Sequence, residues 1–579
     1  MSPDRTGDAE PTRLRHVVLP RRSPGLALLE RFLPSPADNV LDAELTAFAA
    51  ANDTVLDPWA GTGWTARRAV AHGMRAVAAD PSPFAQLAAI AFMTAPGPAA
   101  LDAAFTQIAG ARRVDVPLRQ HLEELYATRC SACRSPVVAD QFIWPRDGHA
   151  PGRKIYRCAT CDAALGGPGD RVAAVDETDL AKLGIEPASR DEVGESGEID
   201  DVEEELPPAP IGLTVMPDEP DEEPIGEPGG PPDPPPLAPD PPTGLQDRPR
   251  FASTVRPEPV PVAAAADGVR QSPQYLELRS RFPVLDGRDD LVDELLDLFT
   301  ARNLYALHAI GEKIESELRE PGVAAVMKLA LAACLLPASR LNGYPGRVAS
   351  LRIVAGHVRR PASRHQREMN VWRAFEAAYR DVRAAIAAVA THETPVRFAA
   401  DYGELGGMAA ANVFWVRSRA AVVGQYLPPD GIDAIVTAPP PPATIDELSF
   451  EYLATGWVLG REAAETLRLE PIFGGAGRAT GVEATALRHG LVSAAGALKP
   501  GGWCSLLLEG GEPERLLGAA MAGAAAGMEL HDVIHRESTA AGDAIILHLR
   551  KPSAEDRLRR AVEPGPLRLG AEGGHLTYP

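Results

Sequence analysis

The chain has 579 residues, more than one ordinary domain holds, and 45% of them are hydrophobic, which excludes a protein that is disordered throughout. Its net charge of −21 argues at first against a nucleic-acid binder, but the stretch from Glu186 to Arg250 alone contains 19 Asp and Glu against 3 Arg. The rest of the chain carries only −5, so its overall acidity is compatible with a local basic groove.

Residues 1–25 are polar and basic, and we expect them to be flexible. They contain no apolar signal core, and no stretch of the chain reaches the roughly 18–20 uninterrupted apolar residues of a membrane span. The sequence therefore predicts a cytoplasmic protein without a membrane partner, and it leaves the oligomeric state open. In a reducing compartment, paired C-x-x-C motifs indicate a metal site rather than disulfides.

Residues 26–125 alternate short apolar runs with Ala-rich amphipathic stretches. The pattern predicts strands at Thr54–Leu56 and Arg75–Ala79, a helix from Thr65, and a second helix over Pro83–Phe92. Such a β-α-β-α order calls for an α/β fold with a parallel sheet and helices on its faces.

A glycine-bearing turn in this half indicates a cofactor site. In TVLDPWAGTGWTARRAV the predicted strand ends at Asp57, and Gly61 and Gly63 precede the helix, so the backbone can approach a ligand closely. Asp80, at the tip of the next strand, suits hydrogen bonds to ribose hydroxyls. Taken singly, the turn is a common loop and Asp80 is a helix cap. Together they predict cofactor-binding residues Asp57, Pro58, Trp59, Gly61, Thr62, Gly63 and Asp80.

Residues 126–165 contain two C-x-x-C pairs separated by 24 residues: Cys130 with Cys133, and Cys158 with Cys161. Each pair forms a knuckle that aims two thiolates at one point, so the four cysteines predict a tetrahedral structural zinc site. The alternatives are two unrelated thiol pairs or a redox dithiol. The two remaining cysteines lie in apolar runs, where buried free thiols are expected.

The next two regions differ sharply in composition. Residues 166–271 are acidic and Pro-rich, and because such a segment buries too little apolar surface to offset its ordering entropy, we expect a disordered linker. Residues 272–425 show helical periodicity and predict a helical insert.

Strand–helix alternation returns over residues 426–552, as a buried strand pattern at Ile432–Thr437, helices at Glu447–Leu459 and Glu483–Leu498, and strands at Trp503–Leu508 and Ala544–Leu549. Residues 553–579 are polar and are expected to form a flexible tail.

The segment VLDPWAGTGWTARRAVAHGMRAVAADPSPFAQLAA resembles the nucleotide-binding segment of the N4-cytosine and N6-adenine DNA methyltransferases. Trp59 replaces the family's Phe, and Trp64 replaces a Thr. The resemblance implies a Rossmann-like class I methyltransferase fold and S-adenosylmethionine as the cofactor. A dinucleotide fits less well, because position 66 is Ala where the third glycine would stand.

The cysteine segment, with Tyr126, Trp144 and Tyr156, looks like the insert of zinc-ribbon-containing adenine-specific DNA methylases. LFTARNLYALHAI and NVWRAFEAAYRDV resemble further segments of that group. The resemblance covers most of the chain outside the acidic linker and both tails. It implies methyl transfer to an exocyclic amine of DNA, with adenine N6 favoured.

The family's catalytic turn, (D/N/S)-P-P-(Y/F/W), holds the target amine and stacks on a flipped base. Its counterpart here comprises Ala438, Pro439, Pro440 and Pro441, so both the acceptor and the aromatic are missing. Three interpretations of this run stay open: it is only a loop, the methyltransferase is weakened or inactive, or another group such as Thr437, Asp446 or Glu447 acts instead. For the function, the alternatives are a catalytically inactive cofactor- and DNA-binding regulatory or scaffold protein, and an RNA methyltransferase.

Overall fold

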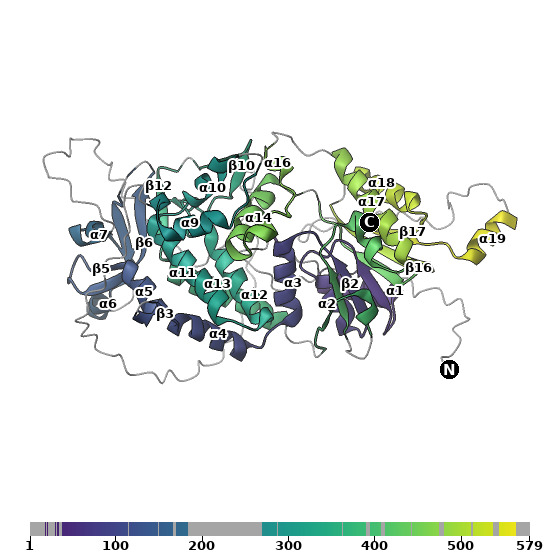
Figure 1. Ribbon diagram of the computed structural model, residues 1–579, viewed down its shortest axis with the longest axis horizontal. Helices are drawn as coiled ribbons and strands as arrows, with labels where there is room; N and C mark the ends of the chain where they lie inside the picture. The colour runs from purple at the N-terminus through teal and green to yellow at the C-terminus, as the bar shows by residue number, and fades with distance from the viewer. Residues whose placement is uncertain are drawn as a thin grey trace, which may run out of the picture.

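The computed structural model describes residues 37–182 and 269–562, apart from short gaps at residues 114, 147, 149, 166–168, 286–287, 362, 390–393, 407–410, 442, 474–479, 511–512 and 537–543, together with residues 18, 20, 29, 32 and 33. Almost all of the expected flexible start, most of the expected linker and the end of the expected tail lie outside the described residues. The described parts form a mixed α/β protein with a large sheet, a helical body and a small antiparallel sheet (Figure 1).

The large sheet has eight strands, and its first six in spatial order are parallel neighbours. The seventh, β18, runs antiparallel to both of its neighbours. The spatial order is β13 (Phe398–Ala399), β14 (Val413–Val416), β2 (Arg75–Ala79), β1 (Thr54–Asp57), β15 (Ile432–Thr437), β16 (Leu498–Glu509), β18 (Ala544–Arg550) and β17 (Glu529–Arg536). The prediction of an α/β protein with a parallel sheet is confirmed.

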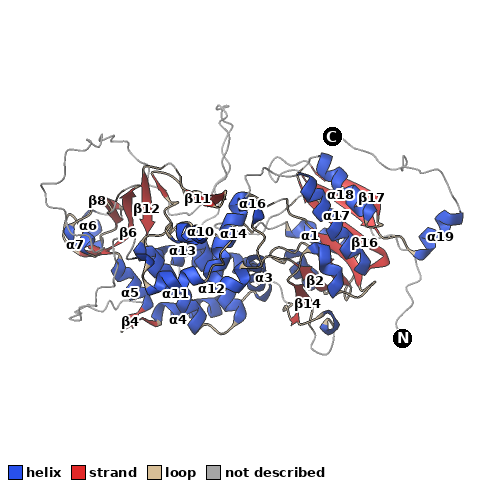
Figure 2. Ribbon diagram, turned by 45° about the horizontal axis from the view of Figure 1, so that its top comes forward, coloured by secondary structure: helices blue, strands red, loops and turns tan. Residues whose placement is uncertain are grey.

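Helices cover both faces of this sheet (Figure 2). Side chains of β1 alternate between two cores: Val55 joins the core that contains α1 (Asp38–Phe48) and α2 (Trp64–Ala71), and Leu56 joins the core that contains α17 (Thr480–Ala497) and α18 (Pro513–Ala525). Because both faces are covered, all four residues of β1 are buried, as expected for a strand inside a doubly covered sheet.

The helical body packs beside the sheet. At its centre α12 (Pro321–Leu335) is mostly buried and apolar apart from Lys328, and it packs against α3 (Pro83–Thr94) of the first half of the chain. A single hydrophobic core extends through these helices. The other helices of the body are α4 (Pro98–Gly110), α5 (Leu118–Leu125), α9 (Pro273–Ser280), α10 (Asp289–Leu296), α11 (Ala301–Glu317), α13 (Val371–Val389), α14 (Ile445–Val458), α15 (Arg461–Ala464) and α16 (Glu470–Phe473).

The small antiparallel sheet, named the ribbon sheet from here on, joins the cysteine segment to the helical body. Its spatial order is β8 (Arg171–Ala174), β7 (Arg153–Tyr156), β6 (Pro136–Pro145), β12 (His365–Met369) and β9 (Gly343–Tyr344), with β5 (Ala127–Arg129) also paired to β6. The helices α6 (Ala159–Leu165) and α7 (Glu177–Ala181) belong to the same segment. Glu368 of β12 accepts hydrogen bonds from Trp144 of β6 and Arg302 of α11. The buried ion pair between Glu368 and Arg302 therefore connects the ribbon sheet to the helical body.

Several expected boundaries differ from the structure: α4 and α5 of the expected cofactor half and α14 to α16 of the expected catalytic half pack in the helical body, and β9 and β12 of the expected helical insert belong to the ribbon sheet. The ribbon segment continues past residue 165, because β8 and α7 belong to it. Strands β13 and β14 fall inside the expected helical insert but pair in the large sheet; a strand of two or four residues gives too short a pattern to stand out among helices. The expected flexible tail contains α19 (Ala554–Val562). The remaining short elements are β3 (Arg112–Arg113), β4 (Val116–Pro117), β10 (Arg352–Val354), β11 (His357–Arg359), η1 (Tyr402–Glu404) and η2 (Ala420–Tyr426).

Candidate functional site

The candidate cofactor site lies where the strand order of the large sheet reverses. Beginning at β1, the chain adds β2 and β14 on one side of the sheet and β15 and β16 on the other. In open parallel sheets, ligands bind outside the carboxyl ends of the strands at such a point. Val55 and Leu56 of β1 pair with Ala434 and Ile435 of β15, so the loop after β1 and the turn after β15 leave the same edge of the sheet.

The loop after β1 is held close to the sheet and is open on one side. Gly63 has φ +78°, a backbone conformation that residues with a side chain rarely adopt, so the start of the helix favours glycine at this position. Gly61 has φ +50°, and a Cβ there would meet no described atom within 4 Å. The open side of Gly61 is therefore where a ligand can approach the backbone.

Asp80 lies directly beside this loop. Its two carboxylate oxygens accept hydrogen bonds of 2.9 Å from the backbone N–H groups of Gly61 and Ser82. Burial raises the pKa of Asp80 to about 7, the two backbone hydrogen bonds oppose that shift, and the nearby carboxyls of Glu451 and Asp57 add to it. The helix-cap alternative fails here, because Ser82 caps α3 by accepting a hydrogen bond from Ala85 N–H.

Asp57 ties the loop to the neighbouring strand. Its Oδ1 atom accepts hydrogen bonds from the Thr437 hydroxyl of β15, at 2.5 Å, and from the backbone N–H of Trp59, at 3.2 Å. Burial raises the pKa of Asp57, and these hydrogen bonds oppose the shift. Asp57 therefore fixes the loop in place rather than facing solvent.

The other predicted loop residues are mostly buried. Trp59 packs its ring against α17, where a Cβ on Gly490 would lie 2.4 Å from the ring. Pro58 is buried, and so is Thr62, whose Oγ1 has no hydrogen-bond partner among the described residues. Trp64 stands 5.2 Å from the ring of Phe92 between centroids, which explains the large residue at this position as part of the core.

Glu451 of α14 is a site residue that the sequence did not reveal. It lies close enough to raise the pKa of Asp80, and its own pKa is raised by burial, against a hydrogen bond from the Ser82 side chain. Its buried Oε1 has no hydrogen-bond partner among the described residues. The only signal in the sequence is its place one helical turn after Glu447, in the helix that follows the proline run.

The proline run leaves β15 next to the loop. Ala438 is half-buried and Pro439 is buried, whereas Pro440 and Pro441 are exposed. The Pro439 carbonyl accepts a hydrogen bond of 3.3 Å from Nη2 of Arg515 in α18. The structure thus brings the run to the edge of the sheet that holds the loop, with one of its carbonyls already in use.

Each of the three residues that were considered as replacements for the missing acceptor makes a different contact. Thr437 is fully buried and donates its hydroxyl to Asp57. Asp446 pairs with Arg352 at 3.1 Å, and Glu447 forms the capping box of α14 with Thr444. The structure gives none of the three a free carboxylate or hydroxyl directed at the turn.

The four cysteines of the ribbon converge on one point. Their sulfur atoms all lie within 4.8 Å of one another, with Cys130 and Cys161 3.7 Å apart and Cys133 and Cys158 3.5 Å apart. Tetrahedral zinc with Zn–S bonds of about 2.3 Å places its sulfurs about 3.8 Å apart, so the four thiolates fit a structural zinc ion. The predicted ligand set is compatible with a metal at this position.

Local structure positions each knuckle. The first follows β5, and its tight turn puts Arg134 in the left-handed region at φ +62°. The second begins after β7 and runs into α6, where Asp162 N–H donates to the Cys158 carbonyl. Tyr156 connects the two knuckles: its hydroxyl accepts from Ser131 N–H at 2.8 Å and lies 3.6 Å from the Cys130 sulfur.

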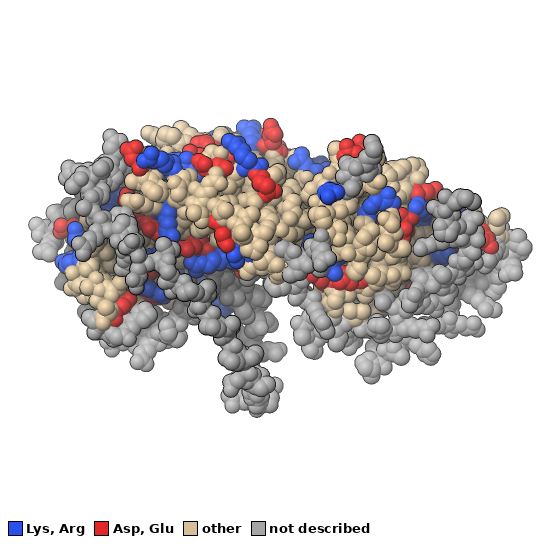
Figure 3. Space-filling view, turned by 90° about the horizontal axis from the view of Figure 1, so that it is seen from below, with Lys and Arg blue, Asp and Glu red and all other residues tan. Residues whose placement is uncertain are grey.

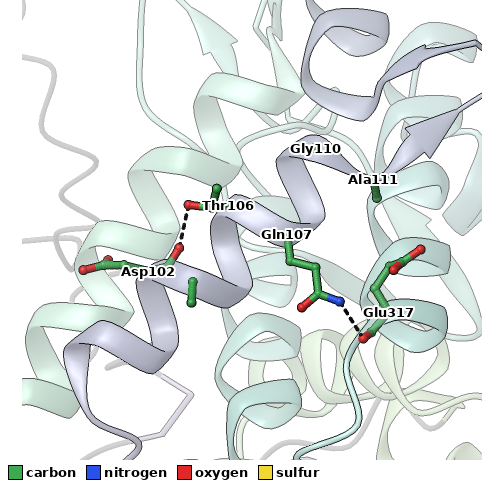
Figure 4. A pocket seen from close by; sticks show the side chains of 7 residues that line it. Asp102, Thr106, Gln107, Gly110, Ala111 and Glu317 are labelled. Atoms are coloured by element: carbon green, nitrogen blue, oxygen red, sulfur yellow. Dashed lines mark hydrogen bonds between the residues drawn. The ribbon is translucent and has the colours of Figure 1, made fainter. Parts of the chain in front are cut away.

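Two other places in the structure, a group of acidic residues with a histidine and a shallow hollow, are weaker candidates for a functional site. Asp290, Glu294 and His357 lie close enough for a cation, but Arg288 approaches His357 at 3.2 Å and supplies positive charge already. A shallow hollow of about 720 Å³ runs along α4 (Figure 4). Its Thr106 and Gln107 side chains are bonded to the backbone carbonyls of Asp102 and Glu317.

None of the helices in the described part of the chain has both the length and the apolar character that crossing a membrane requires. No protein-family model matches the sequence, and no curated protein matches it.

Proposed function

We propose that the chain is an S-adenosylmethionine-dependent methyltransferase with a Rossmann-like class I fold, acting on an exocyclic amine of DNA with adenine N6 favoured. The observation that carries the proposal is the two-glycine loop, open at Gly61, with Asp80 hydrogen-bonded beside it. The sheet supports it, because β14, β2, β1, β15 and β16 follow the 3-2-1-4-5 order of doubly wound nucleotide-binding sheets.

The residues around this loop fit the donor. Each carboxylate oxygen of Asp80 uses one acceptor position on the backbone and keeps another for a ribose hydroxyl. The unhindered side of Gly61 admits the polar part of the cofactor, and the start of α2 presents N–H groups to it. When bound, S-adenosylmethionine would supply a methyl group on a positively charged sulfur.

The proline run supports slow transfer. An exocyclic amine needs acceptors that orient its lone pair toward the methyl group. Ala438 offers no side-chain acceptor, and the Pro439 carbonyl is engaged by Arg515. The same two observations favour a second candidate function, a cofactor- and DNA-binding protein without turnover.

The deciding experiment incubates the full chain with methyl-labelled S-adenosylmethionine and unmethylated DNA or RNA, and then analyses the nucleosides. We expect donor binding by calorimetry and slow labelling of N6-methyladenine in DNA. Donor binding without any label supports the second candidate, and label in RNA alone moves the substrate to RNA. Absence of donor binding contradicts both candidates.

The pH dependence of donor binding tests the role of Asp80. Because the acceptor of ribose hydroxyls is the carboxylate, and its pKa is about 7, affinity should rise as the pH increases through about 7 and then level off. The steepest change is about ten-fold per pH unit, measured by calorimetry between pH ~6 and ~8. Asp80→Ala should weaken binding by roughly 1.5–3 kcal/mol at high pH and remove the dependence.

Glu451→Gln is the matched control. It keeps Asp80 but removes a neighbouring carboxyl that raises its pKa, so the midpoint should move to lower pH. A wild-type affinity that is flat over this range, or that is unchanged in Asp80→Ala, contradicts the assignment of the ribose acceptor.

A further inference from the structure

Positive charge is concentrated in the segment of the chain that connects α12 to α13. On the face shown in Figure 3, Lys and Arg are interspersed with Asp and Glu over the described surface, with no extended patch of one sign. Residues 343–367 differ, because they include no Asp or Glu. This basic segment supplies β9, β10, β11 and the first three residues of β12, ends one residue before Glu368, and carries six arginines: Arg347, Arg352, Arg359, Arg360, Arg364 and Arg367.

The basic segment closes a pocket against two other parts of the chain. The cavity holds about 170 Å³. Arg146 enters it from the end of β6 in the ribbon sheet, and Arg340 enters it from the loop after α12. No carboxylate is among the described residues that line it; the polar ones are Arg146, Arg340, Arg360, Ser363, His365 and Gln366.

Two buried donors at this pocket find no acceptor in the part of the chain that the structure describes. Gln366 is 8% exposed, yet its Nε2 has no hydrogen-bond partner among the described residues, and neither has the buried Nε of Arg340. Burial lowers the pKa of Arg340, and the positive charge of Arg360 lowers it further. Buried donors and like charges held together in this way are costly unless an anion completes the site.

The acids nearest to Arg340 are already engaged. Glu368 and Asp297 oppose the lowering of its pKa. Glu368, however, is paired with Arg302, and Asp297 is paired with Arg270 at 2.5 Å. Among the described residues, no spare carboxylate therefore faces Arg340, and an anionic ligand would complete the site.

We propose that this pocket binds a phosphate group in the backbone of a nucleic-acid strand. Guanidinium forks match phosphate oxygens, and the cavity is smaller than the roughly 300–1,000 Å³ of pockets for drug-sized ligands. A strand fits better than a free phosphate ion, because Arg146, Arg360 and His365 at the pocket are exposed. Arg359 and Arg364 are exposed beside it and continue the positive charge.

The inference rests on the proposed function only for the strand being DNA. Its test uses no methyl donor, so a failure of donor binding and a failure of this pocket give different results. The full chain is titrated against a short fluorescein-labelled DNA duplex by fluorescence anisotropy, between roughly 50 and 200 mM salt.

Arg360→Gln and Arg340→Gln should each weaken duplex binding about ten-fold, and each should reduce the slope of log affinity against log salt by about one. Arg340→Lys should recover part of the affinity, because it restores the charge without the fork. Circular dichroism and zinc content confirm that each variant is folded; Arg360 is exposed, so its replacement leaves the core intact.

The matched control is Arg319→Gln, which removes an exposed charge just beyond the far end of α11. Arg340 N–H bonds the Leu298 carbonyl before the start of α11, and 17 residues of helix separate the two positions by about 25 Å. This variant should change affinity by less than about two-fold. Unchanged duplex affinity in both pocket variants overturns the proposal. If the pocket variants lose binding of inorganic phosphate, measured by calorimetry, but keep their affinity for the duplex, the nucleic-acid assignment is wrong.

Discussion

Removing zinc with a chelator should unfold the ribbon sheet while the large sheet stays folded. Binding of structural zinc contributes about 10–16 kcal/mol in small zinc domains, which exceeds what the small cores of the ribbon provide. Those cores contain few buried residues, and one of them consists of Tyr156 with two of the cysteines that could hold the metal, Cys130 and Cys158. Without the metal, little would hold the knuckles together.

A buried charge increases this dependence. Lys154 of β7 is 1% exposed and donates to Asp176, Asp179 and Thr128, so its charge is balanced only while β7, β5 and the start of α7 stay together. Breaking a buried pair leaves an unbalanced charge and costs several kcal/mol. Loss of the metal should therefore spread from the knuckles to the edge of the sheet at β8.

The measurement is hydrogen exchange with mass spectrometry. After chelation, or in Cys158→Ser, peptides from residues 127–174 should lose protection, while peptides containing β1 and β15 should keep it. Cys334→Ser is the matched control, because Cys334 is buried in α12 outside the ribbon, and it should retain one zinc per chain. Metal-replete wild-type protein without zinc, or equal loss of protection in both sheets, would contradict the assignment.

Local patterns in the sequence predicted the parts of the site that are local in the chain. The strand, the glycine turn and the following helix occupy fewer than 20 residues, and a C-x-x-C knuckle occupies four. Such features depend on backbone conformation and on side chains that are neighbours in the sequence. The sequence therefore predicted the turn with Gly61 and Gly63 and the site formed by the four cysteines. It also predicted the helices that correspond to α3, α14 and α17.

What the sequence did not predict depends on contacts between distant segments. Asp57 accepts a hydrogen bond from Thr437, which lies 380 positions further along the chain, and Arg515 of α18 donates a hydrogen bond to the Pro439 carbonyl. Glu451 matters only because α14 places it beside Asp80. Strand β14 belongs to the large sheet because it pairs with β2, and no pattern within its four residues states that pairing. Sheet order and the roles of these residues follow from tertiary packing alone.

Restoring the missing groups of the proline run should produce the largest change in activity. In Ala438→Asp with Pro441→Tyr, Asp supplies the acceptor for the target amine and Tyr supplies a stacking surface for a flipped base. By analogy with an oxyanion-hole donor, an acceptor of this kind is worth about 2.7–4 kcal/mol, which corresponds to a rate increase of about 10²–10³-fold. Base stacking adds about 1–3 kcal/mol to substrate binding.

The positions of the two residues in the structure suit these roles. Ala438 is half-buried directly after β15 and next to Thr437, so a carboxylate there would stand at the edge of the sheet that holds the loop. Pro441 is exposed, so Tyr fits without displacing the core. Arg515→Ala should add to the effect by releasing the Pro439 carbonyl, since that hydrogen bond competes with the amine.

The rate of label transfer to DNA at saturating S-adenosylmethionine is the measurement, with donor affinity and duplex affinity determined for every variant. Pro440→Asp is the matched control, because it adds the same carboxylate at an exposed position two residues beyond the expected one and should not raise the rate. The double variant should exceed either single change, since orientation of the amine and stacking of the base act on the same step. A wild-type chain that already methylates rapidly, or a double variant that binds donor and duplex but gains no rate, would contradict the assignment of residues 438–441 as the catalytic turn.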